Sequence, residues 1–564
     1  MRRTRTRLLA MMMSVTLVAA CGGDDDTSSS GSATTSHETA GAPGTDPVTP
    51  GETTDAPDGT AVATVPEQPL AEGLVDHVPV ADDYDPEAIF RWGYSLDPTS
   101  LDPHRGSNPA DLTYLSPLYD RLVWTAPSGA YEPMLATSWS LSDDLTVITF
   151  DLREGVKFHD GADLDAEAVK TSLDRARGEG STVAADLVSV VDVRVTGPMQ
   201  IEIEVSGGAG ALFGSLSDRA GMIVSPDAID DPDLGTHPVG AGPYELSEWR
   251  AGDRVIYSKF DGYWDPAVQR VAGMEYRNIP DEQTRLNALQ TGELDMMVTS
   301  ANRVKATLDT GYNALAGLSP GLLGFSVNAG RPPFDDPLVR KALWQAIDRE
   351  SIANELLEGY CAPQLQFWPA NSWAYDQDLG PALDVYAYDP DAARALLVEA
   401  GYPDGFEFKS LTSNVVTFTP ILEVIQQNFA DIGVTMNMEV VDAAQVFALY
   451  KVDKTVDGVL EVYTGAPDPS GTLNALLLPS SFGNPGGAAS DRVVELAEQA
   501  QNLTDQAERA ELYHEITAEL LEFVPHIGNI CMRYRTEAFV PGVSGIWIYA
   551  SGARDFRGVA ITPQ

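Results

Sequence analysis

Apolar and polar residues alternate in short segments of this chain, and each such segment predicts a β-strand. In residues 146–152, Ile148, Phe150 and Leu152 fall on one face, with polar residues between them. Residues 434–440 repeat the pattern. Because successive side chains of a strand point to opposite faces, both segments are expected to pack against a core on one side.

Apolar residues recur at helical spacing in other segments. Residues 166–175 follow Asp165, which predicts a helix with an aspartate cap, and a second helix is expected to open at Asp336-Pro337. Further helices are expected from Pro420 and over 491–501 and 505–521. Helical and strand segments alternate along the chain, which predicts α/β layers.

The first twenty residues have the pattern of a secretory signal. Four arginines precede an apolar run over residues 8–20, and Cys21 follows directly. The sequence Val-Ala-Ala-Cys at 18–21 resembles the bacterial lipobox, in which the cysteine receives a diacylglyceryl group. The alternative is a short transmembrane anchor, but the apolar run covers only roughly 20 Å of a hydrocarbon core about 30 Å thick. We therefore predict a signal peptide over 1–20 and lipidation of Cys21.

Residues 21–87 are predicted to form a disordered linker that is anchored by the lipid. Between Leu8 and Phe90 the chain has 15 Asp and Glu residues and no Lys or Arg, with many Thr, Ser, Gly and Pro residues. Such a composition cannot bury enough apolar surface to offset the entropy of ordering. No later segment is long and apolar enough to span a bilayer, so the lipid is the only membrane contact that we expect.

The remaining chain is large and acidic. Roughly 475 residues exceed what one hydrophobic core usually serves, so two or three lobes are expected. The net charge is −47, and nucleic acid is not expected as a partner because phosphate contacts need a basic face. One interpretation of the acidity is a heavily solvated surface, and the other is electrostatic steering of cationic ligands.

Two cysteines remain besides Cys21. Cys361 and Cys531 would lie in an oxidising compartment, where a disulfide between them can persist, and two buried thiols are the alternative. The seven histidines are scattered and none forms an i, i+4 pair. Because this spacing does not match a metal site, we expect neither a metal nor a cofactor.

Several segments, in this order, resemble one protein family. They include Leu-Asp-Pro-His at 101–104, Leu-Arg-Glu-Gly-Val-Lys-Phe-His-Asp-Gly at 152–161, and Val-Gly-Ala-Gly-Pro-Tyr at 239–244, together with 118–123, 135–139, 328–348 and 388–403. The chain resembles the bacterial extracellular solute-binding proteins of family 5, which include dipeptide-, oligopeptide- and nickel-binding lipoproteins of ABC importers. The resemblance extends over residues 89–558.

The family implies an α/β, periplasmic-binding-protein-like fold of the class II type, with two lobes, a hinge and an extra subdomain. Lobe I would comprise 88–127, 237–333 and 535–564, subdomain II would comprise 128–236, and lobe III would comprise 334–534. Two crossing strands would join the lobes, and the solute would bind between lobes that close on it. A membrane permease would recognise the closed form.

Several residues are candidates for contact with the solute. Phe325 and Asn328 lie where the chain would cross from lobe I to lobe III, and core or hinge packing is the alternative for Phe325. Trp368 lies in an aromatic loop, where a ring can serve as a platform for sugars, peptides or cations, or can simply anchor the loop. The other candidates are Ser107, Asn414, Tyr463, Thr464 and Asp468.

Residues 461–469 bear on the chemistry of the solute. In dipeptide and oligopeptide binders, the comparable segment has a Trp, then an Asp that pairs with the ligand's α-amino group, then Asp-Pro. Here Tyr463 replaces the Trp, Ala466 stands where that Asp would be, and Asp468 matches the later Asp-Pro. A buried ammonium needs a paired carboxylate, so the sequence argues against recognition of a free peptide N-terminus.

The sequence therefore predicts an extracytoplasmic, membrane-tethered receptor that captures a peptide or peptide-like solute and delivers it to an ABC permease. Oligosaccharides and metal chelates are the alternative solutes. No nucleophile elbow, zinc-binding helix or phosphate-cradling loop is present, so an enzyme is not expected. A secreted hydrolase and a surface adhesin or sensor are the alternatives from other classes. The receptor is expected to be a monomer.

Overall fold

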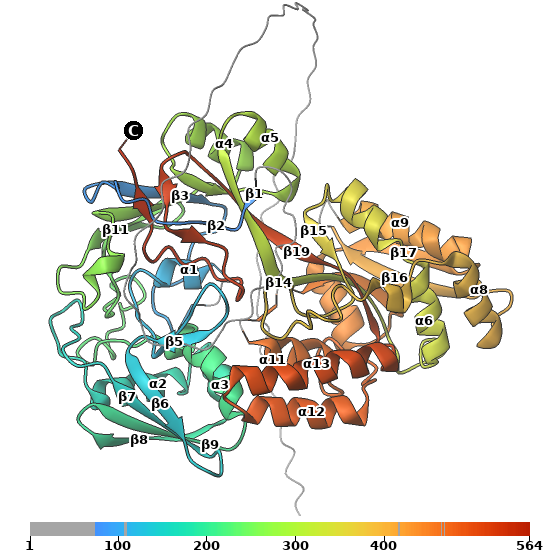
Figure 1. The fold of residues 1–564 in the computed structure, drawn as a ribbon, viewed down its shortest axis with the longest axis horizontal. Coiled ribbons are helices and arrows are strands. Elements are labelled where there is room, and N and C mark those ends of the chain that lie inside the picture. Colours follow the sequence, from blue (N-terminus) through green and yellow to red (C-terminus); the bar gives the residue numbers. More distant parts are fainter. Residues whose placement is uncertain (1–73, 107–109, 415–417, 464, 467, 564) are drawn as a thin grey trace, which may run out of the picture. The chain divides into compact units, whose positions relative to one another are not determined.

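A large mixed sheet extends through most of the described chain (Figure 1). The computed structural model describes residues 74–106, 110–414, 418–463, 465–466 and 468–563. The sheet has 12 strands, in the order β10-β11-β12-β3-β13-β19-β14-β18-β16-β17, with β1 paired to β14 and β15 paired to β19. Its strands are β1 Leu74–Val75, β3 Ile89–Tyr94, β10 Tyr244–Arg250, β11 Arg254–Lys259, β12 Gly273–Asn278, β13 Met296–Val298, β14 Asn313–Val327, β15 Cys361–Pro363, β16 Glu407–Ser413, β17 Thr435–Val441, β18 Gly458–Tyr463 and β19 Ile527–Phe539.

Two long strands connect the two halves of this sheet. β14 has 15 residues and β19 has 13, and they pair antiparallel over most of their length. At one end β19 pairs with β13, and at the other end β14 pairs with β18. The expected pair of crossing strands is therefore present, and the predicted α/β fold class is confirmed.

A separate four-stranded sheet, β6-β7-β9-β8, has its own core. The strand predicted over 146–152 is β7, and the helix predicted after Asp165 is α2, which Asp165 caps by accepting a hydrogen bond from the Ala168 amide at 2.9 Å. The elements of this part are β4 Val123–Thr125, β5 Tyr131–Pro133, β6 Ala136–Leu141, β7 Val147–Leu152, β8 Val190–Gly197, β9 Gln200–Val205, α2 Ala166–Ala176 and α3 Ala209–Leu216.

Several helices pack against the large sheet, among them α4, α5, α9 and α10. The predicted cap at Asp336 is present, because its carboxylate accepts a hydrogen bond from the Leu338 amide. The helices are α1 Asp111–Leu115, α4 Glu282–Gln290, α5 Val304–Asp309, α6 Pro337–Ala346, α7 Arg349–Ser351, α8 Pro390–Glu399, α9 Phe418–Asp431, α10 Ala443–Val446, α11 Pro469–Thr472, α12 Asp491–Asn502 and α13 Gln506–Phe523. Short 3₁₀ turns lie at Ala184–Leu187, Arg219–Gly221, Pro266–Val268, Ala301–Arg303 and Leu383–Tyr386, and π-turns lie at Ile352–Leu356, Phe447–Val452 and Leu473–Leu477.

The end of the predicted linker is ordered. β1 pairs in parallel with β14, and β2 (His77–Val78) pairs with β21 (Ile546–Trp547). The His77 ring stacks on Trp547 with 4.6 Å between ring centroids. The prediction of disorder up to residue 87 is therefore wrong for these strands, because pairing with distant strands orders a segment whose composition alone indicates disorder. Two further short strands, β20 Val543–Ser544 and β22 Ala560–Ile561, pair with each other.

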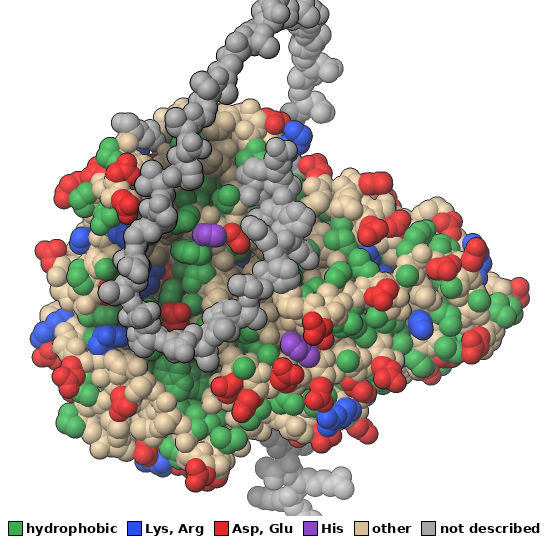
Figure 2. Space-filling view, in the orientation of Figure 1, with side chains coloured by type: hydrophobic (Ala, Val, Ile, Leu, Met, Phe, Trp, Pro, Cys, Tyr) green, Lys and Arg blue, Asp and Glu red, His purple; other side chains and the backbone are tan. Residues whose placement is uncertain are grey.

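The described residues form several separate hydrophobic cores. Trp92 and Phe556 belong to one core, Phe150 and Phe213 to a second, and Phe325 and Trp344 to a third. A fourth contains Trp368 and Tyr513. The lobe boundaries themselves stay a prediction. Acidic side chains are spread over the face seen in Figure 2, and among the described residues no helix is both long and apolar enough to cross a bilayer.

Candidate solute-binding site

The candidate site is the edge of the large sheet where the crossing strands leave its first half. β3 runs parallel to both β12 and β13, so the carboxyl ends of these three strands meet at one edge. Ligands of open α/β sheets bind in the crevice outside such carboxyl ends. The pairing of β13 with β19 ends at Val298 and Glu537, and β19 continues beyond this point toward β15 and the second half of the sheet. β14 and β19 therefore pass the edge at which the candidate site is expected.

Asp468, a predicted contact, is fully engaged within the protein. The Arg509 guanidinium from α13 binds both carboxylate oxygens at 2.8 Å, and the Tyr131 hydroxyl donates to Oδ2 at 2.7 Å. The same carboxylate caps α11 by accepting from the Ser470 amide at 2.9 Å. Burial opposes ionisation of Asp468, but Arg509 outweighs it and lowers the pKa of this carboxyl below its ordinary value. Asp468 therefore holds β5, α11 and α13 together and has no capacity left for a ligand ammonium.

Phe325 and Trp368 are corrections to the predicted contacts. Phe325 is fully buried, with its ring set edge-on to Phe429 at 5.5 Å between centroids. Trp368 is 2% exposed, and its indole N–H donates to the Pro469 carbonyl at 3.3 Å. Both rings lie in hydrophobic cores. Phe325 therefore has the alternative role of core packing, and Trp368 has the alternative role of anchoring its loop.

The remaining candidates differ in accessibility. Asn328 is buried, and its side-chain oxygen accepts from the Gly330 amide at 3.2 Å, which fixes the turn after β14. Tyr463, at the end of β18, is half-buried and donates to the Gly471 carbonyl at 3.3 Å. Asn414, which follows β16, is exposed. Ser107, Thr464 and Cys21 lie outside the described residues.

Two arginines of β19 were missed by the sequence analysis. Arg533 is exposed and Arg535 is half-buried, and neither side chain makes a hydrogen bond or ion pair with the described residues. Burial, reinforced by the positive charge of Arg554, lowers the pKa of Arg535 to about 9. The available signal was the Arg-Tyr-Arg alternation at 533–535, which puts two like charges on one face of a strand.

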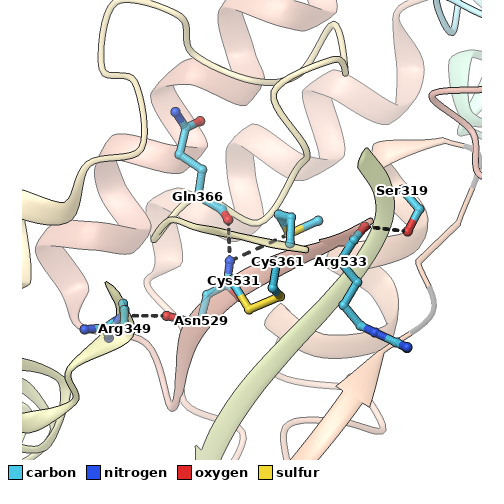
Figure 3. The surroundings of a disulfide bond; sticks show 8 residues. Ser319, Arg349, Cys361, Gln366, Asn529, Cys531 and Arg533 are labelled. Carbon is cyan, nitrogen blue, oxygen red and sulfur yellow. Dashed lines mark hydrogen bonds between the residues drawn. A yellow bond between two sulfur atoms is a disulfide. The ribbon is translucent and has the colours of Figure 1, made fainter. Parts of the chain in front are cut away.

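A disulfide joins the crossing strand to β15. Cys361 and Cys531 are bonded, with their Cα atoms 5.5 Å apart, so the bonded alternative is the one that the structure has. Around the bridge, the Asn529 amide donates to the Gln366 carbonyl at 2.6 Å, and Arg349 donates to the Asn529 carbonyl at 2.7 Å (Figure 3). These bonds fix β19 on the side of the site that belongs to the second half of the sheet.

One cavity lies apart from this crevice. It has a volume of about 260 Å³ and is walled by three tryptophans, Trp124, Trp264 and Trp547. Val268 and Arg270, which also line it, precede β12, so the cavity lies near the amino ends of the parallel strands. It contains none of the predicted contacts. Among the described residues, no group of three or more His, Cys, Asp or Glu side chains could hold a metal ion.

The chain belongs to the bacterial extracellular solute-binding proteins of family 5. The model for the middle region of that family matches residues 130–484, more than half of the sequence. The resemblance seen in the sequence is thereby confirmed. The protein is an extracytoplasmic, solute-binding component of an ABC importer.

Curated relatives and solved structures agree with this assignment. The glutathione-binding protein GsiB of Escherichia coli O157:H7 is 30% identical over 466 residues, which cover 80% of this chain and 90% of that protein. DppA of Helicobacter pylori, solved in complex with the peptide STSA, superposes with a TM-score of 0.68 at 24% identity and covers 85% of this chain and 98% of its own. NikZ of Campylobacter jejuni, solved with Ni(L-His), has a TM-score of 0.68 at 20% identity and covers 84% of this chain and 99% of its own.

Proposed function

We propose that this protein is a lipid-anchored receptor that takes up a peptide or peptide-like solute in the crevice between lobe I and lobe III. The observation that carries the proposal is the pair β14 and β19, which joins the two halves of one sheet and passes the carboxyl ends of β3 and β13, where we expect the crevice. The name of the relative GsiB and the peptide bound to DppA favour a peptide-like solute over an oligosaccharide or a metal chelate.

Accessible residues around the crevice are the proposed contacts. Asn414 and Tyr463 offer an amide and a half-buried aromatic ring from the second half of the sheet. Ser107 and Thr464 are proposed with them on the basis of the family resemblance. Because Asp468 is bound to Arg509 and Ala466 has no charge, an ammonium group of the solute is not recognised by this segment. The protein acts by binding and closing, and catalysis is not part of the proposal.

Binding is tested with the whole chain after the predicted signal peptide, carrying Cys21→Ser so that it is not lipidated. Dipeptides, tripeptides including glutathione, oligosaccharides and nickel–histidine are each added during thermal unfolding. A solute at 100 times its Kd is expected to stabilise the protein by roughly 2.7 kcal/mol. A shift with sugars or nickel–histidine only would contradict the peptide-like class, and hydrolysis of a bound solute would contradict a binding role.

Lipid anchoring makes a separate prediction. In cells, Cys21→Ser is expected to release the protein from the membrane fraction and to abolish incorporation of labelled fatty acid, because a diacylglyceryl group contributes about 0.8 kcal/mol per buried CH₂. The matched variant Ser14→Cys retains Cys21 and is expected to stay in the membrane fraction. Retention of the Cys21→Ser variant on membranes would show that another segment anchors the chain.

A further inference from the structure

Few of the described arginines lack a partner within the protein, and two of these few lie on β19. The chain has 83 Asp and Glu residues against 36 Lys and Arg residues, so an arginine has many potential partners. Among the described arginines, only Arg105, Arg533 and Arg535 have side chains with no hydrogen bond, ion pair or ring contact. Arg105 lies against Gly180, and the other two lie on β19. The pair on β19 is the one that bears on the candidate site.

Arg535 is placed at the carboxyl ends of the parallel strands. It stands two residues from Glu537, which pairs with Val298 at the end of β13. Its partner across β14 is Gly317, and the room left by the missing side chain of Gly317 is filled by Ile548. Arg533 precedes Arg535 by two residues on β19, so both side chains are on the same face of the strand. The side chain of Arg533 extends away from the disulfide (Figure 3). Two arginines thus lie in succession on one face of β19.

The acidic residue two positions from Arg535 on β19, Glu537, is already bound by other side chains. Glu537 is 2% exposed, and its carboxylate is bound by Arg554, with 2.5 Å between Nε and Oε1, and by the Trp92 indole at 3.3 Å. The Nη1 atom of Arg535 is buried without a partner. A buried donor without a partner is destabilising, and for a charged group the cost is larger. The guanidinium group of Arg535 therefore lacks an acidic partner within the described chain, although acidic residues are abundant. It is free to bind an anion from outside the protein.

We propose that Arg533 and Arg535 form an anion subsite that binds a carboxylate of the solute. The inference rests on the proposed function and narrows its substrate class to anionic peptide-like solutes. A planar carboxylate matches the fork of a guanidinium group and accepts two parallel hydrogen bonds from it. The carboxylate of Asp468 is already bound by Arg509 and is not available to the solute. The two arginines would therefore give the site a positive charge that segment 461–469 does not offset.

The test compares peptides that differ in one charge. Calorimetric titration of the unlipidated Cys21→Ser chain uses each peptide that binds, as the free acid and as the C-terminal amide, and with Glu replaced by Gln. Charged hydrogen bonds of about 1.5–3 kcal/mol correspond to about 10- to 100-fold in Kd. At least one neutralisation is expected to weaken binding by about that factor, and Arg535→Gln is expected to remove the difference between acid and neutral peptide.

A control variant and a second probe distinguish failure of the anion subsite from failure of the peptide-like class. Arg194→Gln, which removes an exposed arginine paired with Glu204 on β9, is expected to leave all affinities unchanged. Citrate at constant ionic strength is expected to raise the Tm of the parent more than that of Arg535→Gln or Arg533→Gln. Equal binding of acid and neutral peptides, with no citrate effect that depends on these arginines, would overturn the anion subsite and leave the receptor role intact. A citrate effect that depends on the arginines, without any peptide binding, would support the subsite and overturn the peptide-like class.

Discussion

Arg509→Met is expected to lower the free energy of unfolding by about 3–5 kcal/mol. Arg509 is fully buried and binds both oxygens of Asp468 at 2.8 Å. Removing it leaves the Asp468 carboxylate buried beside Tyr131 without a counter-charge, and an uncompensated buried charge is far more destabilising than the loss of an exposed ion pair. Urea unfolding, followed by tryptophan fluorescence, measures the change.

Two controls separate the charge from the packing. Arg492→Gln removes an exposed arginine of α12 that pairs with Glu495, and it is expected to change stability by less than about 1 kcal/mol. Adding Asp468→Asn to Arg509→Met removes the stranded charge and is expected to recover part of the loss. If the single variant is as stable as the parent, Asp468 is not held by this pair and its availability to a solute must be reconsidered.

The same pair makes stability depend on acid pH. The pKa of Asp468 is lowered in the folded protein by Arg509, against the effect of burial. Its stabilising contribution is therefore fully present above the unfolded-state pKa of about 3.9 and is lost as the pH falls through the lower, folded-state value. The Arg509→Met variant is expected to lack this part of the acid transition, which unfolding curves between neutral pH and pH 3 would show.

Removing the disulfide is expected to lower the free energy of unfolding by about 2–5 kcal/mol. Cys361 and Cys531 are 170 residues apart in sequence, so the bond closes a long loop and restricts the unfolded chain strongly. The bond also holds β15, which has only three residues, against β19. The variant to measure is Cys361→Ala with Cys531→Ala, by urea unfolding.

Reduction of the parent protein provides the matching control for the disulfide. A reductant is expected to destabilise the parent by a similar amount and to leave the double alanine variant unaffected. Thiol counting under denaturing conditions confirms that the bond was broken. Equal stability of the reduced and oxidised parent would contradict a structural role for the bridge.

Local signals made several elements predictable. The aspartate caps at Asp165 and Asp336 act within one helical turn, so they mark the starts of α2 and α6 without knowledge of the rest of the fold. The alternation in β7 likewise reports a strand with one buried face. The segment 74–78 carries no such signal, because β1 and β2 each have two residues and are ordered by pairing with β14 and β21.

The site was harder to predict than the fold, because a contact residue is defined by what surrounds it. Phe325 and Trp368 were placed correctly near the crossing strands and an aromatic loop, but nothing in the sequence shows that their rings point into cores. Arg535 is a candidate contact that the sequence did not indicate. An arginine usually finds an acidic partner in an acid-rich chain, and only the three-dimensional arrangement reveals that Glu537 is already bound to Arg554.

Small-angle X-ray scattering of the unlipidated Cys21→Ser chain, with and without a saturating solute identified by thermal unfolding, tests the central claim most directly. Capture between lobes joined by β14 and β19 predicts a smaller radius of gyration in the bound state, because contacts to both lobes favour the closed form. Binding that leaves the scattering curve unchanged would contradict capture by closure around the crevice.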